Sequence, residues 1–349
     1  MTYLRNAWYA AALSTEVKDA PLARLLLDEN VVLFRTESGE AGAIEDRCSH
    51  RFAQLSMGKV RGEALECGYH GLRFGRDGKC VLNPHGNKAI PNNAHIRGYP
   101  VHERYGFIWY WPGEPALADV SKIPAFPFNE NPEEFSTVYG YLDVAGNYQL
   151  VVDNLLDLSH VEWLHPMFQQ EGGVDAHRTE FFVEGHEVVA NRWKPNVKKH
   201  GLHGHFWTSP STHYDARSNM RWMPPSNMNF DLGATECGAS VDEGVKLPNA
   251  HLVTPATELR CHYFWSVARN RRVNDEEAGR KLYEIVQRIF STEDIPMIEA
   301  QQRNMGKVTD IMALRPVSIE PDIPAVRARR ILAELIRAEQ GDGKAAAAE

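Results

Sequence analysis

Two short segments of this chain each carry one cysteine and one histidine, and sixteen residues lie between them. The first segment is Cys48-Ser-His50 and the second is Cys67-Gly-Tyr-His70. Two thiols and two imidazoles form one metal centre only if the two segments fold against each other, which strongly constrains the fold. In a 2Fe–2S cluster, two histidines can replace two cysteines on one iron, which removes negative charge and raises the reduction potential. The sequence therefore predicts that Cys48, His50, Cys67 and His70 hold a 2Fe–2S cluster.

A structural zinc site is the competing interpretation of these four residues, because zinc also binds two cysteines and two histidines. Zinc fingers usually pair cysteine with cysteine and histidine with histidine, whereas the two types alternate here. The five cysteines of the chain are an odd and sparse set, which argues against a disulfide framework and favours reduced thiols. The three others are expected to be inert structural thiols: Cys80, Cys237 and Cys261.

Short strand-like runs surround both segments. From about residue 25 to residue 111 these runs alternate with turns, and Arg76-Asp77-Gly78 between two of them predicts a hairpin. Segment 111–134 holds five prolines and little periodicity, so we expect a linker there. Strand-like runs return over about 178–270.

Helical periodicity is confined to other parts of the chain, at about 147–164, 275–304 and 325–340. The sequence thus predicts an α+β protein. We expect an N-terminal all-β domain over 1–115 that holds the cluster. A larger antiparallel-sheet domain with packed helices is expected over 116–340, followed by a disordered tail over 341–349.

A second group of polar residues lies in the first helical segment. Asn154, Asp157 and His160 are spaced by three and would share one face of a helix, and His165 follows five residues later. Both histidines can reach one metal only if the helix bends or ends between them, and Pro166 fits such an end. Two histidines and one carboxylate form the facial triad of iron(II) oxygenases, which leaves positions for O₂. A buried helix with merely hydrogen-bonded histidines is the alternative. The candidate carboxylates on the late helix are Glu284, Glu293, Asp294 and Glu299.

Charge and composition argue against several classes of function. With 46 acidic and 38 basic residues, the chain does not resemble a nucleic-acid binder, which needs clustered lysines and arginines. No apolar run reaches transmembrane length and the N-terminus lacks a signal-peptide pattern, so we expect a cytoplasmic protein that contacts no membrane. His200, His203 and His205 resemble a metal tract, but the glycines and lysines around them favour a mobile loop near the pocket mouth.

The pattern C-x-H-R, a spacer and C-x-x-H-G is the Rieske signature, and the segments CSHR and CGYHG resemble it. Gly68 and Leu72 stand where many Rieske proteins carry Pro and Trp, but neither is a ligand. The stretches RNAWYAAAL, YQLVVDNLLDLSHVEWLHP and HLVTPATE look like those of vanillate and dicamba O-demethylase oxygenases, so the resemblance spans nearly the whole chain. It implies a helix-grip-like catalytic domain in which a mononuclear Fe(II) is held by His160, His165 and Asp294.

The resemblance also implies an assembly and partners. Members of this family are head-to-tail homotrimers, in which one subunit's cluster lies beside its neighbour's iron. Asp157 would then bridge His70 of one chain to His160 of the next, and Asp157 and Asn154 would belong to the catalytic machinery. The chain contains no G-x-G-x-x-G fingerprint, so a separate NAD(P)H-dependent reductase of the ferredoxin or flavin type is expected to supply the electrons.

The implied reaction is the O₂-dependent O-demethylation of a methoxylated aromatic acid, such as vanillate, to a phenol and formaldehyde. Asn229 and His251 are the candidates for contacting this small aromatic substrate, although both also fit ordinary sheet positions. A Rieske oxygenase that hydroxylates an aromatic ring or a methyl group, or that N-demethylates, is the first alternative. The second is of another class, a non-catalytic electron carrier or a zinc-stabilised binding module.

Overall fold

The structure is a computed structural model and describes residues 3–168 and 178–346. The chain divides into two compact units. Unit 1 comprises Met1–Ile123 with Thr254–Thr257, and unit 2 comprises Pro124–Val253 with Glu258–Glu349. The division after Ile123 falls inside the proline-rich segment 111–134, where the described secondary structure is limited to three 3₁₀ turns.

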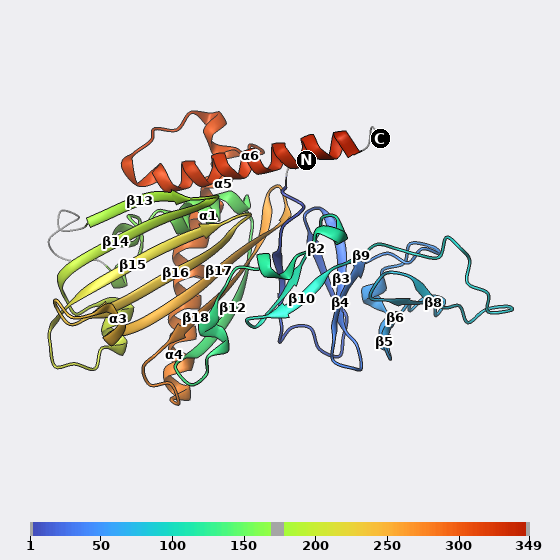
Figure 1. Cartoon of the computed structure of the whole chain (residues 1–349), viewed down its shortest axis with the longest axis horizontal. Coiled ribbons are helices and arrows are strands. Elements are labelled where there is room, and N and C mark those ends of the chain that lie inside the picture. The colour runs from blue at the N-terminus through green and yellow to red at the C-terminus, as the bar shows by residue number, and fades with distance from the viewer. Residues whose placement is uncertain (1–2, 169–177, 347–349) are drawn as a thin grey trace. The chain divides into compact units, whose positions relative to one another are not determined.

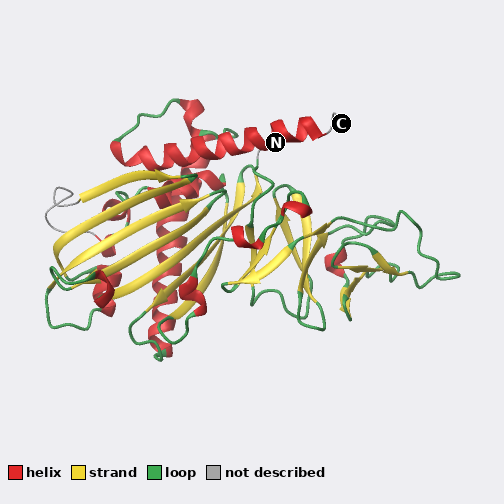
Figure 2. Ribbon diagram, in the orientation of Figure 1, coloured by secondary structure: helices red, strands yellow, loops and turns green. Residues whose placement is uncertain are grey.

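Unit 1 is built from short antiparallel strands, which confirms the prediction of an all-β domain (Figures 1 and 2). Its strands form three sheets, with the orders β1-β11-β10, β2-β3-β4-β9 and β5-β6-β7-β8. The strands are β1 (Tyr9–Leu13), β2 (Leu22–Leu26), β3 (Glu29–Arg35), β4 (Ala41–Glu45), β5 (Lys59–Arg61), β6 (Ala64–Glu66), β7 (Arg73–Gly75), β8 (Cys80–Leu82), β9 (Gly98–Tyr99), β10 (Val101–Arg104) and β11 (Phe107–Tyr110).

The predicted hairpin at residues 76–78 is confirmed, because β7 and β8 are antiparallel neighbours joined by this turn. Gly78 has φ +78°, and a Cβ atom there would lie 2.1 Å from the Ile96 carbonyl oxygen. Only glycine fits this position. One buried core joins the β5–β8 sheet to the metal-binding segments, since Phe74 and Leu65 cluster with Cys48 and Cys67.

Unit 2 is built on one seven-stranded antiparallel sheet of order β12-β18-β17-β16-β15-β14-β13, as the sequence predicted (Figure 1). In Figure 2, helices stand against one face of this sheet, and the C-terminal helix runs beside β13 and β14. The strands are β12 (Ser136–Val144), β13 (Arg178–Glu184), β14 (Glu187–Lys198), β15 (His213–Met223), β16 (Asn227–Thr235), β17 (Val245–Thr257) and β18 (Arg260–Arg269). The helices are α1 (Tyr148–Leu156), α2 (Val161–Leu164), α3 (Gly201–Phe206), α4 (Glu276–Ile289), α5 (Ile295–Met305) and α6 (Ile323–Ala346).

The two late helical segments differ in detail from the prediction. The segment expected as one helix over 275–304 begins at the cap Asp275, whose carboxylate accepts a hydrogen bond from the Ala278 N–H, and it is interrupted by a π-helical turn over Phe290–Asp294. The last helix does not end at residue 340 but continues to Ala346, because alanine favours helix strongly enough to outweigh two glycines. Residues 347–349 of the expected disordered tail lie outside the described residues.

The helix expected over 147–164 is also interrupted. Asn147 caps α1 by accepting from the Gln149 N–H at 2.9 Å, and α1 ends at Leu156. The expectation that Asn154, Asp157 and His160 lie along one helix face is therefore wrong, since the backbone leaves the helical conformation at Asp157. Polar side chains of the Asp and Ser type compete for the backbone at such positions, and Ser159 donates to Asp157 here.

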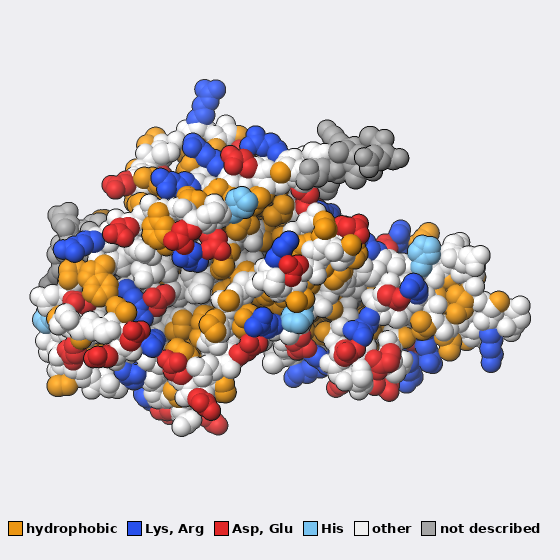
Figure 3. Space-filling view, viewed as in Figure 1, with side chains coloured by type: hydrophobic (Ala, Val, Ile, Leu, Met, Phe, Trp, Pro, Cys, Tyr) orange, Lys and Arg blue, Asp and Glu red, His pale blue; other side chains and the backbone are white. Residues whose placement is uncertain are grey.

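The surface carries charges of both signs. Acidic and basic side chains are interspersed over the face shown in Figure 3. None of the helices in the described part of the chain combines the length and the apolar character that a membrane crossing requires.

Candidate metal centres and substrate cavity

The two cysteine–histidine segments of unit 1 fold as loops with the same hydrogen-bond pattern. In each loop the carbonyl oxygen of the cysteine accepts a hydrogen bond from the N–H of the residue four positions later. The N–H of the cysteine donates to the carbonyl oxygen of the residue five positions later. The bonds are Phe52 N–Cys48 O at 2.9 Å, Cys48 N–Ala53 O at 2.8 Å, Gly71 N–Cys67 O at 2.9 Å and Cys67 N–Leu72 O at 2.8 Å. Phe52 and Gly71 occupy the equivalent fourth positions with φ of 59° and 74°. The backbone alone therefore fixes where each cysteine lies.

This arrangement separates the two ligand types. Cys48 and Cys67 are both buried, whereas His50 is exposed and its imidazole ring centroid lies 4.6 Å from that of His70. Burial raises the pKa of the Cys48 thiol to about 11, and the neighbouring Cys67 contributes to the rise. A raised pKa favours the protonated thiol, and metal binding reverses this preference because only a thiolate coordinates the metal. Thiols on the inner side and imidazoles on the outer side fit a two-iron cluster with one iron for each ligand type.

In unit 2, His160, His165 and Asp294 bring three ligand atoms together. The two Nε2 atoms are 3.3 Å apart, and each lies 3.4 Å from Asp294 Oδ1. Adjacent positions of an octahedron with metal–ligand bonds of about 2.1 Å lie about 3 Å apart, so this triangle fits one face of an iron coordination sphere. His165 and Asp294 are buried at 4% and 3% exposure. The donor set and its spacing fit the predicted ferrous site.

Both imidazoles are held with Nε2 toward this triangle. His160 Nδ1 contacts the Asp157 carbonyl oxygen, and His165 Nδ1 lies 2.7 Å from Glu293 Oε2. Each contact places the proton on Nδ1 and leaves Nε2 free to coordinate. Burial lowers the pKa of His160, but hydrogen bonding and attraction to Asp294 outweigh it and raise that pKa overall. The site thus favours positive charge.

Asp294 takes its position from the π-helical turn, and Asn154 Nδ2 donates to its Oδ1 at 3.1 Å. Among the described residues, the other acidic candidates of this segment do not belong to the triangle. Glu293 binds His165, Glu299 accepts from the backbone of Ala145, and Glu284 is exposed.

The triad lies at the wall of a cavity of about 140 Å³. Typical ligand pockets measure about 300–1,000 Å³, so this volume suits a single-ring compound. The cavity face of the sheet comes from β14, β15, β16 and β17, opposite α1, α2, α4 and the π-helical turn. Its apolar lining consists of Leu155, Leu158, Val161, Phe168, Leu202, Ala216, Met220, Phe230, Leu232, Val286, Ile289 and Phe290.

Of the two predicted substrate-contacting residues, one lines the cavity and the other does not. His251 lines the cavity at 2% exposure, and its Nε2 has no hydrogen-bond partner among the described residues. Asn229 is not brought to the cavity, because strand residues alternate between faces and its neighbour Phe230 points inward. The amide that does line the cavity is Asn249, opposite Phe230 on β17.

The expectation of a mobile loop at His200, His203 and His205 is wrong. These residues belong to α3 and its N-cap, and His203 is buried at 5% exposure in the cavity lining, because the apolar Leu202 and Phe206 anchor the turn. Sequence reasoning did not single out Arg192, Lys194 and Asn249, which also line the cavity. Arg192 and Lys194 could have been found as cations two apart on a strand whose same face carries Val188 and Ala190.

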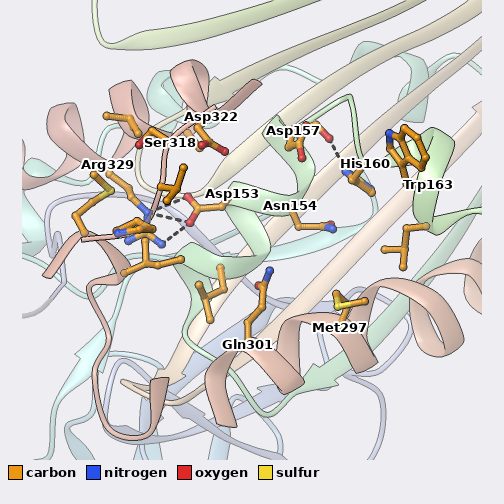
Figure 4. A pocket seen from close by; sticks show the side chains of 18 residues that line it. Asp153, Asn154, Asp157, His160, Trp163, Met297, Gln301, Ser318, Asp322 and Arg329 are labelled. Carbon is orange, nitrogen blue, oxygen red and sulfur yellow. Dashed lines mark hydrogen bonds and ion pairs between the residues drawn. The ribbon is translucent and has the colours of Figure 1, made fainter. Parts of the chain in front are cut away.

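Asp157 and His160 also line a second hollow of unit 2, shown in Figure 4. The Asp157 carboxylate accepts from the Ser159 N–H at 2.8 Å and from its hydroxyl at 2.5 Å. Exposed apolar side chains surround it, including Trp163 at 78% and Val317 at 91% exposure. Lower in this hollow, Asp153 is paired with Arg329 at 2.6 Å (Figure 4).

Comparison with known proteins identifies both units. Residues 7–100 match the Rieske [2Fe-2S] domain, and residues 144–338 match the vanillate O-demethylase oxygenase C-terminal domain. The oxygenase component of dicamba O-demethylase from Stenotrophomonas maltophilia is 38% identical, over 97% of this chain and 99% of that protein. The oxygenase component of chloroacetanilide N-alkylformylase from Rhizorhabdus wittichii is 36% identical, over 97% of each.

The fold agrees with these matches. A crystal structure of dicamba monooxygenase with non-haem iron and dicamba superposes with a TM-score of 0.85 at 35% identity, and it covers 98% of this chain and all of that one. The Rieske match decides against a zinc site at the cysteine–histidine loops, and a full-length oxygenase match decides against a non-catalytic carrier. The chain therefore belongs to the Rieske non-haem iron oxygenases, within the group of oxygenase components that includes the vanillate and dicamba O-demethylases.

Proposed function

We propose that this protein O-demethylates a methoxylated aromatic acid. Cys48, His50, Cys67 and His70 would hold the 2Fe–2S cluster, and the triad of His160, His165 and Asp294 would hold the mononuclear iron. When bound, the cluster would deliver electrons and the mononuclear iron would activate O₂. The observation that carries the proposal is the triad at the wall of a small, mostly apolar cavity, where a single-ring substrate is held against it.

The protein's own residues orient the substrate and keep water away. The Tyr263 hydroxyl lies 2.8 Å from His251 Nδ1, and we propose that it donates to Nδ1. The proton of His251 then sits on Nε2, which faces the cavity as a donor for an oxygen atom of the substrate. Burial lowers the pKa of His251 to about 3, which keeps the imidazole neutral. The rings of Phe230 and Phe290 line the space beside it.

This orientation places the methoxy carbon at the triad. Each turnover consumes one O₂, two electrons and two protons. The methyl carbon gains a hydroxyl group, and the other oxygen atom leaves as water. The hemiacetal then breaks its C–O bond and releases the phenol and formaldehyde.

We further propose that the electrons come from a separate NAD(P)H-dependent reductase and that the protein works as a head-to-tail homotrimer in the cytoplasm. The exposed apolar side chains around Asp157 support an interface there, because such surfaces are uncommon on isolated proteins. Asp157 would connect His160 of its own chain to the partner's cluster histidine. The reduced thiols that the cluster requires favour the cytoplasm.

Formaldehyde release tests this function. Purified protein would be supplied with NADH, a compatible reductase and a panel of mono- and dimethoxybenzoates, and both formaldehyde and the matching phenol would be quantified. We expect equimolar amounts of the two products that depend on O₂. Ring-hydroxylated products with the methoxy group intact would contradict the proposal.

N-dealkylation is the second candidate, because the relative from Rhizorhabdus wittichii is named a chloroacetanilide N-alkylformylase. The neutral His251 would serve an amide oxygen as well as an ether. N-alkylated anilides in the same assay separate the two reactions.

A further inference from the structure

Two buried cations stand at the β14 end of the cavity. Arg192 and Lys194 project from the same face of β14, line the cavity and are only 5% and 8% exposed. Glu162 is the carboxylate that they share, with Arg192 Nη2 at 2.9 Å and Lys194 Nζ in direct contact with the same oxygen atom. Glu162 is thus a shared acceptor for two buried cations.

The two cations differ in how many partners they have. Asp157 attracts Arg192 in addition to Glu162. Arg192 itself is fixed by donating Nη1 to the Leu158 carbonyl oxygen at 2.6 Å. Lys194 has three N–H donors, and Glu162 is its only acceptor among the described residues. Donors of Lys194 thus remain for a ligand.

A third donor lies at the same end. His203 on α3 is 5% exposed, lines the cavity, and its Nε2 has no hydrogen-bond partner in the described part of the chain. Burial, together with the charges of His200, Arg217 and Lys194, lowers the pKa of His203 to about 3, so its ring stays neutral. A buried polar atom without a partner destabilises the protein, and a ligand at this place would offset that cost.

The other end of the cavity differs in charge. His251 lies on β17, which is separated from β14 by β15 and β16. The row of paired residues that starts at Arg192 runs through Ser218 and Leu232 to Leu247, and His251 lies four residues beyond Leu247 on β17. The cavity therefore has one cationic end and one neutral donor end.

We propose that Arg192, Lys194 and His203 bind the anionic group of the substrate, a carboxylate or a sulfonate, at the β14 end of the cavity. This assignment rests on the proposed function for the reaction and adds the substrate's charge and its direction in the cavity. An anion at this place takes up the spare donors of Lys194 and satisfies His203 Nε2. A neutral analogue makes a weaker hydrogen bond to the Lys194 ammonium group.

Ligand binding without turnover tests this assignment. Iron-loaded protein is titrated anaerobically by calorimetry with 4-methoxybenzoate, 4-methoxybenzenesulfonate and the neutral 4-methoxybenzamide. The variants are Lys194→Met, Lys194→Arg and the control Lys198→Met, which removes an exposed lysine of the same strand. We expect Lys194→Met to weaken binding of the preferred anion by about tenfold or more, since hydrogen bonds to charged groups are worth about 1.5–3 kcal/mol. The amide affinity should be unchanged, Lys194→Arg should restore part of the loss, and Lys198→Met should resemble the wild type.

Two results overturn the assignment. One is a wild-type protein that binds the amide as tightly as both anions, a comparison that needs no variant to fold. The other is equal loss of anion and amide affinity in Lys194→Met. The proposed reaction fails separately, when the anions bind in the expected order but release no formaldehyde with reductase and O₂. The two anions distinguish a carboxylate substrate from a sulfonate substrate.

Discussion

Glu293 and Asp294 are adjacent in the sequence but have different partners. Asp294 joins the two histidine Nε2 atoms, whereas Glu293 accepts from His165 Nδ1 on the far side of that ring and is also bound by Arg288 at 2.9 Å. A carboxylate behind a metal-binding imidazole orients the ring and increases its basicity.

We therefore expect Glu293→Gln to weaken iron binding by about tenfold while the Rieske cluster is retained, because loss of a carboxylate behind a ligand costs about 10–100-fold in metal affinity. Iron content after dialysis against a graded chelator series measures this effect, and the visible absorbance reports the cluster. Glu284→Gln, an exposed change on α4, serves as the control. Equal iron retention in both variants would count against a role for Glu293.

Single residues of the site were unequally predictable. The cluster residues could be predicted from ligand chemistry and from their short spacing within each loop. Neither depends on the rest of the fold, as long as the two loops come together. Asp294 could be chosen among four acids only through the family resemblance, since helical periodicity does not locate a distant partner. Asn229 was misplaced because a shift of one residue along a strand moves a side chain to the other face.

At the scale of elements, the π-helical turn Phe290–Asp294 positions Asp294, the proposed iron ligand. Such turns are rare and occur mostly as single turns inside α-helices, often at functional sites. Sequence periodicity predicted one continuous helix here, because a single π turn hardly changes the apolar pattern. The end of α1 at Leu156 was likewise invisible to periodicity.

Deletion of Thr292 should convert this turn to a regular α-helix and rotate Asp294 away from the histidines. We expect the variant to lose the mononuclear iron and all turnover, while the cluster spectrum and the cooperative thermal unfolding persist. Thr292→Ala is the control, since it removes only the hydroxyl that donates to the Arg288 carbonyl at 2.8 Å. A deletion variant that keeps its mononuclear iron would show that the π turn is dispensable.

At the scale of the molecule, the two periodicities in the sequence predicted the architecture well. Alternating runs and helical runs occupy different segments, so an all-β domain followed by a larger sheet with helices could be expected. The strand order was not predictable, because pairing depends on contacts between distant segments. The oligomeric state could not be predicted from either periodicity.

The hollow around Asp157 bears on that assembly. We expect Trp163→Glu to shift the protein from trimer to smaller species in light scattering after size exclusion, since it places a charge on an exposed apolar surface. Leu117→Glu, an exposed apolar residue of unit 1, is the matched control. A wild-type protein that is monomeric at micromolar concentration would refute the proposed trimer.

Asp157→Asn should keep both metal centres and the trimer but lower formaldehyde formation by about 100-fold, because the lost carboxylate can no longer orient imidazoles on both sides of an interface. Iron, sulfide and light-scattering measurements accompany the assay. Asp242→Asn, an exposed acidic residue outside the hollow, should behave as the wild type. Full activity in a metal-replete Asp157→Asn protein would rule out the bridge.

The matching hydrogen bonds of the two cysteine loops have a consequence for how the protein matures. Each loop is closed by its own main chain, through Cys48 with Phe52 and Ala53 and through Cys67 with Gly71 and Leu72. We therefore expect both loops to close during ordinary folding, before iron and sulfide are bound. Newly synthesised chains would then have folded loops without a cluster, and the supply of clusters would determine how many chains become active.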